Sequence, residues 1–287
     1  MDGEAPSAPS VIEADAAIEA PFDPGAPATL PPLAHRSVLL DLDYTGAGIA
    51  EDNGSTFAIL ARVGGEVPIY EDRWHAGFAW DFVSAATAGE GRALVYGNPE
   101  VWLRGVNLHE SGLGAGGGLG VVVPLPRQSS SRELGVVDNI RVLRPWNTNT
   151  WKNEMLTFRP SFDLRYLFNP FNFQVRQGLD WSYDFDAARS DLVARIGTYA
   201  GVDLVKSITA GVELWQTYSI TADVEDNQRA AFTLSPLIRF RVDPIEPGLS
   251  LLVPLSTPLE GIATGYFAVR IHVRMALGKT TAVTYAP

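Results

Sequence analysis

Arginine, histidine and carboxylate side chains recur at every second position in several segments of this chain. Arg270, His272 and Arg274 are one such run, and Asp163 and Arg165 are part of another. Guanidinium groups pair bidentately with carboxylates and stack on aromatic rings, so these residues could bind anionic or aromatic molecules. The candidate set is Arg159, Asp163, Arg165, Arg176, Asp180, Glu213, Arg239, Arg241, Arg270, His272 and Arg274, with Asp41, Asp43, Arg62, Asp81, Arg195 and Asp203 at equivalent positions.

Four of these arginines fall in two segments that are separated by a nearly uncharged one. Arg239 and Arg241 lie in the first, and Arg270 and Arg274 lie in the second. If the three segments are neighbours, their charge is hard to neutralise locally. The pattern predicts an electropositive wall that favours anionic solutes or aromatic carboxylates.

Enzyme motifs are absent or stand in the wrong context. Residues 112–117 match G-x-G-x-x-G, but the run Val121–Val123 that follows is typical of a strand, whereas phosphate binding requires the start of a helix. There is no G-x-S-x-G, no H-E-x-x-H and no cysteine, and the four histidines lack metal-ligand spacing. The net charge of -11 argues against nucleic-acid binding. We expect no catalytic residue, no metal, no cofactor and no enzymatic activity.

The charged positions belong to long segments of alternating apolar and polar residues. In 266–277 one face carries Phe267, Val269, Ile271 and Val273, and the opposite face carries the basic run. Residues 156–168, 171–185 and 232–242 alternate in the same way. These segments are ten or more residues long, which exceeds the usual strand of a soluble protein and suits a tilted strand that crosses a membrane. The apolar face would then meet lipid and the charged face would line the interior.

About twelve such segments can be read along the chain, and their connections alternate between tight turns and longer polar loops. The segments are 35–47, 55–70, 73–86, 92–109, 112–126, 154–168, 171–186, 190–204, 206–222, 228–242, 247–256 and 262–277. Short turns at one end and long loops at the other are typical of membrane barrels whose termini are both periplasmic. The sequence predicts an all-β protein with a single transmembrane antiparallel up-and-down β-barrel of about twelve strands over residues 34–278.

Three other regions have a distinct composition. Residues 1–33 are acidic and rich in Ala and Pro, which predicts a disordered leader. Residues 279–287 are a short C-terminal extension. Residues 127–153 form a long outer loop with many apolar residues, so we expect it to fold over or into the barrel mouth and set a constriction. The candidate constriction residues are Leu134, Val137, Ile140, Trp146 and Trp151.

Several of these segments resemble a known group of proteins. Residues 62–78 (RVGGEVPIYEDRWHAGF) read as the strand, short turn and strand of the Gram-negative outer-membrane proteins named for the meta-pathway of phenol degradation. Residues 96–105 (YGNPEVWLRG) are similar to the Gly-Asp-x-x-x-x-x-Arg segment of that group, with Asn98 in place of Asp, and residues 114–126 are similar to its Gly-rich strand. The resemblance covers residues 35–278 and implies a twelve-stranded barrel that passes small, often aromatic, molecules. The extension beyond residue 278 departs from the group.

These observations lead to one expected function and two alternatives. We expect a channel for passive diffusion of small solutes, anionic or aromatic, in the outer membrane of a Gram-negative bacterium. The alternatives are a structural or partner-binding barrel with an occluded lumen and a soluble β-barrel that binds a ligand in an apolar interior. No secretory signal is visible after Met1, which is consistent with a mature form whose signal was removed or with a cytoplasmic protein. Expected partners are outer-membrane lipid and lipopolysaccharide, the solute, and a periplasmic protein bound by the N-terminal leader.

Overall fold

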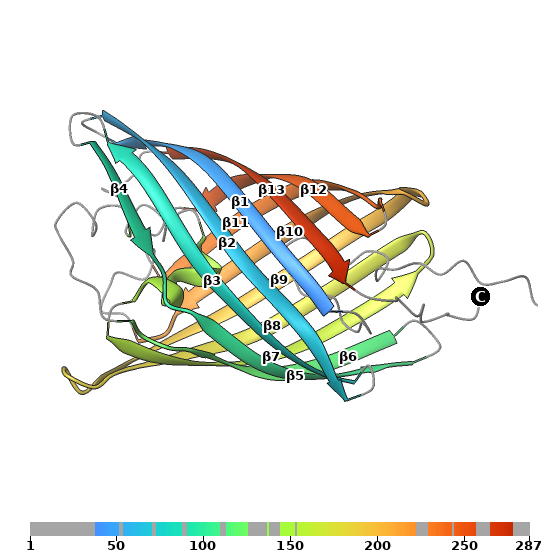
Figure 1. The fold of residues 1–287 in the computed structure, drawn as a ribbon, viewed down its shortest axis with the longest axis horizontal. Coiled ribbons are helices and arrows are strands. Elements are labelled where there is room, and N and C mark those ends of the chain that lie inside the picture. The colour runs from blue at the N-terminus through green and yellow to red at the C-terminus, as the bar shows by residue number, and fades with distance from the viewer. Residues whose placement is uncertain are drawn as a thin grey trace, which may run out of the picture.

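The chain forms a barrel of antiparallel strands in the computed structural model (Figure 1). The structure describes residues 38–51, 54–70, 73–87, 91–109, 113–125, 137, 144–152, 154–221, 229–242, 244–256 and 265–277. The strands are β1 (Val38–Glu51), β2 (Gly54–Tyr70), β3 (Trp74–Thr87), β4 (Gly91–Tyr96), β5 (Glu100–Leu108), β6 (Leu113–Val122), β7 (Met155–Phe168), β8 (Phe171–Asp184), β9 (Arg189–Val205), β10 (Ile208–Ser219), β11 (Ala230–Phe240), β12 (Ile245–Ser256) and β13 (Gly265–Leu277).

The barrel is closed because the first strand pairs with the last. β1 pairs with β13 from Val38↔Leu277 onward and with β2 on its other edge. β4 and β5 both pair with β3 and together form one side of the wall, so thirteen strands make a twelve-stranded barrel. Among the described strands, closure gives each one except β4 a paired neighbour on both edges, which is how barrels satisfy their backbone groups; β4 pairs with β3 alone. The predicted fold class is confirmed.

The interruption between β4 and β5 was not predicted, because residues 92–109 read as one strand. At the interruption the Gly97 N–H still donates to the Asp81 carbonyl on β3, at 2.7 Å. The next N–H, of Asn98, instead donates to the Thr150 carbonyl, at 2.6 Å. Pro99 has no N–H to contribute to the ladder. The chain therefore leaves the regular ladder here to contact a segment inside the barrel.

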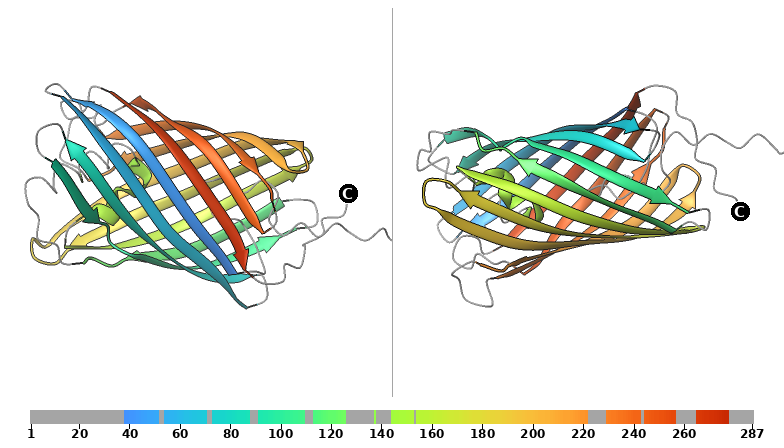
Figure 2. Two further views of the ribbon diagram at one scale, coloured as in Figure 1. Left: turned by 45° about the horizontal axis from the view of Figure 1, so that its top comes forward. Right: turned by 90° about the horizontal axis from the view of Figure 1, so that it is seen from below.

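All the long connections between strands lie at one end of the barrel, and the other end has only short ones (Figures 1 and 2). The first end, called the turn end, holds the connections at 71–73, 109–112, 169–170, 206–207 and 241–244, together with the start of β1 and the end of β13. The other, the loop end, holds 52–53, 88–90, 123–154, 185–188, 220–229 and 257–264. The ends at which the strands are joined agree with the sequence prediction, but the loop-end connections 52–53 and 88–90 are as short as those of the turn end.

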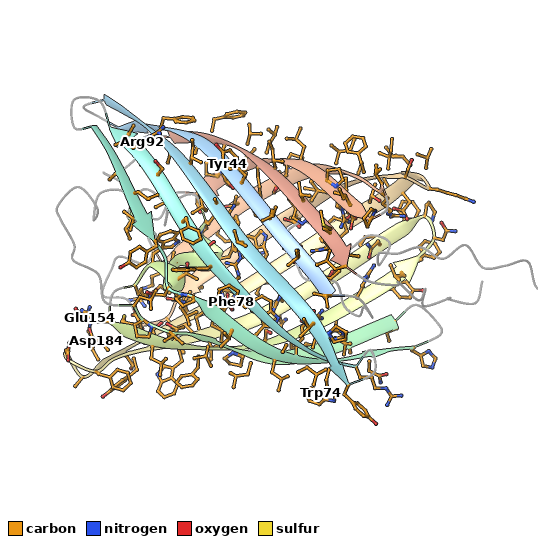
Figure 3. The ribbon with its side chains drawn as sticks, in the orientation of Figure 1. Tyr44, Trp74, Phe78, Arg92, Glu154 and Asp184 are labelled. Atoms are coloured by element: carbon orange, nitrogen blue, oxygen red, sulfur yellow. The ribbon has the colours of Figure 1, made fainter. Side chains whose placement is uncertain are left out.

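Apolar side chains face outward and charged side chains face inward (Figure 3). Ile271 is 48% exposed, whereas its neighbours Arg270 and His272 are 4% and 3% exposed. Phe240 and Arg239 show the same contrast, at 39% and 0%. This arrangement is the inverse of a soluble barrel, which buries its apolar face. The alternative of a soluble barrel with an apolar interior is therefore wrong.

Outward aromatic side chains lie near both ends of the barrel. Trp74, Phe168 and Phe171 are exposed at the turn end, where the rings of Phe168 and Phe171 stack with centroids 5.8 Å apart. Tyr218 and Phe267 are exposed toward the loop end. Two aromatic girdles of this kind are typical of barrels whose rings meet a membrane interface on each side.

One short helical element lies within the long connection between β6 and β7. It is the 3-10 helix η1 (Pro145–Trp151), and most of its residues are buried. In the described part of the chain, no helix has the length and apolar character needed to span a membrane. The predicted leader at 1–33, the extension at 279–287 and the residues Leu134 and Ile140 lie outside the described residues.

Candidate functional site

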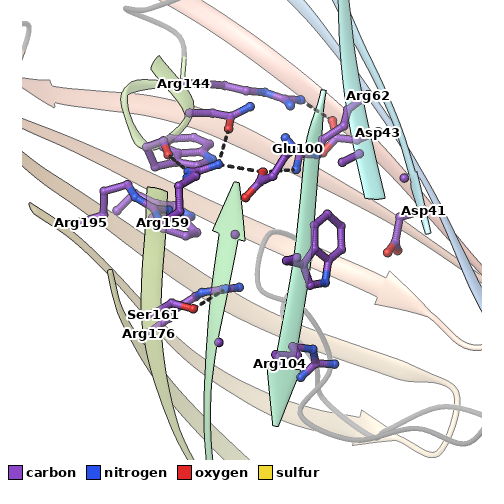
Figure 4. A pocket seen from close by; sticks show the side chains of 18 of the residues that line it. Asp41, Asp43, Arg62, Glu100, Arg104, Arg144, Arg159, Ser161, Arg176 and Arg195 are labelled. Atoms are coloured by element: carbon purple, nitrogen blue, oxygen red, sulfur yellow. Dashed lines mark hydrogen bonds and ion pairs between the residues drawn. The ribbon is translucent and has the colours of Figure 1, made fainter. Parts of the chain in front are cut away.

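A cavity of about 160 Å³ lies inside the barrel, and Figure 4 shows it from close by. Three carboxylates line it, from Asp41, Asp43 and Glu100. The other principal lining side chains are eight arginines and three tryptophans: Arg62, Arg104, Arg144, Arg159, Arg176, Arg195, Arg270, Arg274, Trp102, Trp146 and Trp215. In Figure 4, Arg144 marks one end of the cavity and Arg104 the other.

Glycines on β2 and β6 provide the space for this cavity. Gly64 on β2 and Gly118 and Gly120 on β6 face it. A Cβ atom at Gly118 would lie 2.7 Å from the Cβ of Arg104, which is closer than real Cβ atoms approach. The Gly-rich sequence of β6 therefore lets the arginine pack directly against the wall and leaves the centre of the barrel open.

Arg159 on β7 is the centre of the charged network on the loop-end side of the cavity. Its Nη1 donates to Glu100 at 2.8 Å, its Nε donates to Asp180 at 3.2 Å, and its Nη2 donates to the Trp146 carbonyl at 3.1 Å. Arg195 on β9 donates to the same Asp180 oxygen at 2.7 Å. Arg159 and Asp180 are almost fully buried, so both side chains lose their hydrogen bonds to water. The hydrogen bonds described above offset that loss.

Residues 144–152, called the inner segment, lie inside the barrel and are fastened to its wall on several sides. Arg144 forms an ion pair with Asp43 on β1. Asn147 Nδ2 donates to Asp81 on β3 at 2.7 Å. The remaining contacts run from Asn149 Nδ2 to Asp180 on β8 at 2.5 Å, from Lys152 Nζ to Asp191 on β9 at 2.6 Å, and from Asn98 Nδ2 to the Lys152 carbonyl at 2.6 Å.

The predicted interior residues fall into three groups according to where they lie relative to this cavity. Arg159, Arg176, Arg270, His272 and Arg274 line it directly. Asp163, Asp180 and Glu213 are buried beside it as partners of the arginines, and Arg165, Arg239 and Arg241 lie nearer the turn end. Of the predicted constriction residues, Val137, Trp146 and Trp151 are buried in one apolar cluster inside the barrel. The described residues contain no group of three His, Asp or Glu side chains that could hold a metal ion.

The prediction of an electropositive wall that is hard to neutralise is wrong, because each of its four arginines has a carboxylate partner. Arg239 lies 3.1 Å from Glu246, Arg241 lies 2.8 Å from Asp203, and Arg274 lies 2.8 Å from Asp41. Arg270 pairs with Asp43. The sequence placed Glu246 in a turn, but it is the second residue of β12, and closure of the barrel brings the acids of β1 beside β13.

Several site residues were missed by sequence reasoning. Glu66 and Arg104 continue the alternation of polar residues on β2 and β5, so a stricter use of the two-residue period would have found them. Arg144, Asn147 and Asn149 belong to the connection between β6 and β7, which has no such period. Their sequence context gave no indication that Arg144 and Asn147 line the cavity or that Asn149 contacts Asp180.

Comparison with known proteins supports the fold. No protein-family model matches the chain, and neither does any curated protein. The structure is similar to the COG4313 outer membrane channel from Pseudomonas putida F1, with a TM-score of 0.63 and 11% sequence identity over 89% of this chain and 100% of that chain. It is also similar to the NanC porin, with a TM-score of 0.55 and 14% identity over 82% of this chain and 100% of that chain. At these identities the likeness concerns the fold of a closed antiparallel barrel.

Proposed function

We propose that this protein is a channel in the outer membrane of a Gram-negative bacterium and that small solutes cross it by diffusion. The observation that carries the proposal is the inverted barrel: an apolar, aromatic-rimmed outer surface encloses a charged interior with a cavity. This distribution suits a wall in contact with lipid and a water-filled path within it. The two similar structures described above are those of an outer membrane channel and a porin.

The cavity lining favours small anions, and aromatic carboxylates among them. The arginines face the cavity, while several carboxylates that balance them, such as Glu66 and Asp180, lie behind it. Trp102 contributes a fixed aromatic face, since its ring lies against Gly77, where a Cβ would come within 2.1 Å of the ring. Guanidinium groups and indole faces together suit a solute with one carboxylate and one ring. This solute class agrees with the resemblance to the phenol-degradation group.

The inner segment is the constriction of this channel on the loop-end side. Trp146 and Asn147 form part of the cavity lining, and the segment is fastened to β1, β3, β8 and β9. Val137 and Trp151 extend the same obstruction as part of the apolar cluster, and Leu134 and Ile140 belong to the same connection. Any solute that enters from the loop end must pass this segment.

Single-channel recording in planar bilayers tests the channel function. The full chain is expected to produce small, stepwise currents, and a variant that lacks residues 130–148 is expected to produce larger steps. Liposome swelling with benzoate and with an uncharged sugar of similar size then compares solute classes, and faster swelling with benzoate is expected. A folded protein that passes neither ions nor solutes, with or without residues 130–148, would contradict the proposal.

The buried inner segment also favours a second candidate, a barrel with a closed lumen that serves as a structural or partner-binding protein. The inner segment is packed like a permanent plug, because Asn147, Asn149 and Trp151 are at most 4% exposed. In that case residues 1–33 would bind a periplasmic partner, while the outer surface contacts lipid and lipopolysaccharide. This candidate predicts no current from the full chain and a partner that copurifies only when residues 1–33 are present.

A further inference from the structure

Six charged residues gather inside the barrel toward its turn end. They are Asp41, Glu66, Arg104, Arg239, Glu246 and Arg274, and we call them the turn-side collar. Each lies within four residues of the turn-end terminus of its strand, on β1, β2, β5, β11, β12 and β13 respectively. All except Asp41 are at most 3% exposed. Asp41, Arg104 and Arg274 also line the cavity, so the collar borders the cavity toward the turn end.

The ion pairs of the collar differ in how firmly they are held. Glu66 accepts hydrogen bonds from Arg104 Nε at 2.8 Å, from Arg104 Nη2 at 2.5 Å and from Trp102 Nε1 at 2.6 Å. Arg274 Nε donates to Asp41 at 2.8 Å. These are charge-assisted hydrogen bonds with fixed geometry, and they keep two parts of the collar rigid.

Arg239 and Glu246 form the exception. Their nearest nitrogen and oxygen atoms are 3.1 Å apart, yet no hydrogen bond of standard geometry joins them. Tyr199 on β9 also lies beside Arg239, and Arg274 interacts with Glu246. Both side chains are almost completely buried, at 0% and 1% exposure. A buried charge pair without supporting hydrogen bonds is held less firmly than one that has them.

The path of the Arg239 side chain depends on the residue beside it. Arg239 pairs with Gly248 on β12, and Gly248 pairs with His272 on β13. A Cβ at Gly248 would lie 2.9 Å from Arg239 Cγ and 3.5 Å from His272 Nδ1. The glycine therefore leaves the space in which the arginine stem lies against the wall.

We propose that the turn-side collar is a second gate, in series with the inner segment, and that Arg239 and Glu246 are its moving parts. An anionic solute in the cavity replaces Glu246 as the partner of Arg239 and passes the collar while the two side chains are apart. The rigid pairs of Glu66 with Arg104 and of Asp41 with Arg274 hold the rest of the collar in place. This inference rests on the proposed channel function and adds the residues that select and release the anion.

Reversal potentials in a KCl gradient across planar bilayers test the gate, with the full chain and single charge changes. Glu246→Gln leaves the Arg239 charge uncompensated and is expected to raise the chloride-to-potassium permeability ratio several-fold. Arg239→Gln leaves the Glu246 charge uncompensated and is expected to lower that ratio several-fold. The double variant that exchanges the two residues, Arg239→Glu with Glu246→Arg, is expected to return the ratio toward that of the wild type. Asp186→Asn, in the exposed turn after β8, is the matched control for a lost carboxylate.

The outcomes separate this inference from the proposed function. If the folded wild type passes no current, both are overturned. If the wild type conducts but the two Gln variants keep its permeability ratio, the second gate is overturned and the channel function stands. Should the Gln variants fail to fold, as judged by heat modifiability on a gel, Glu246→Asp retains the charge but shortens the reach of the carboxylate. A larger single-channel conductance in Glu246→Asp supports the gate, and an unchanged conductance overturns it.

Discussion

Trp146 of the inner segment stacks on Trp215 of β10, with ring centroids 5.2 Å apart and planes inclined by 19°. Both rings are buried, and both line the central cavity. The stack adds an apolar contact to the polar contacts that hold the inner segment to β1, β3, β8 and β9. The inner segment is thus held to the wall by both hydrogen bonds and an aromatic contact.

Removing this stack should loosen the inner segment without dismantling the barrel. Stacked aromatic pairs contribute about 0.5–1.5 kcal/mol beyond their buried area, so Trp215→Leu is expected to give larger and more frequently fluctuating single-channel currents. The matched control is Trp181→Leu, since Trp181 stacks on Phe158 at 5.7 Å on the outer surface. Equal currents in Trp215→Leu and the wild type would show that the stack does not restrict conduction.

Asn98 should stabilise the junction between the wall and the inner segment. Its Nδ2 donates to the Lys152 carbonyl at 2.6 Å, and its Oδ1 accepts from the Leu125 N–H at 3.0 Å. Asn98→Asp keeps the acceptor but loses the donor, and it places a buried charge there. Loss of one buried hydrogen-bond partner costs about 1–3 kcal/mol, so urea unfolding in detergent should show a clear loss of stability. An unchanged free energy of unfolding would show that the hydrogen bond lost in this variant does not stabilise the junction.

Arg159 should be more important for stability than any other cavity arginine. Arg159→Met keeps the approximate length of the side chain but leaves Glu100 with Arg62 and Asp180 with Arg195 as their remaining partners. Breaking a buried pair typically costs about 3–5 kcal/mol, and a lower value is expected here because each acid retains one arginine. The measurement is the midpoint of thermal unfolding in detergent. Arg189→Met is the control, because Arg189 is 73% exposed.

Gly77 should be essential for the position of Trp102. A Cβ at Gly77 would lie 2.1 Å from the Trp102 ring, so Gly77→Ala must displace the indole toward the cavity. The expected result is a lower single-channel conductance together with altered tryptophan fluorescence. Gly46→Ala on the outer face is the matched control, since its Cβ would meet only Phe57 at 4.0 Å. If the two variants conducted equally, Trp102 would not border the solute path.

Local sequence and barrel closure determine different features of the charged interior. The alternation of Phe267, Val269 and Ile271 with Arg270 and His272 was enough to predict which side chains face outward, because a strand has a period of two whatever its neighbours are. The same local pattern could not show that Arg270 meets Asp43, more than two hundred residues away. That contact exists only because β1 and β13 close the barrel in one register.

The sequence determined the closed barrel of about twelve strands, the approximate limits of most strands and the inverted apolar surface, since each depends on local spacing. It also predicted that residues 127–153 fold over or into the barrel mouth. The tertiary structure alone decided which charges neutralise each other, where the strand at 92–109 is interrupted and which wall residues hold residues 144–152. Pairings such as Arg239 with Glu246 depend on the stagger between neighbouring strands, and the contacts of Arg144 and Asn149 depend on the interior that the whole wall encloses.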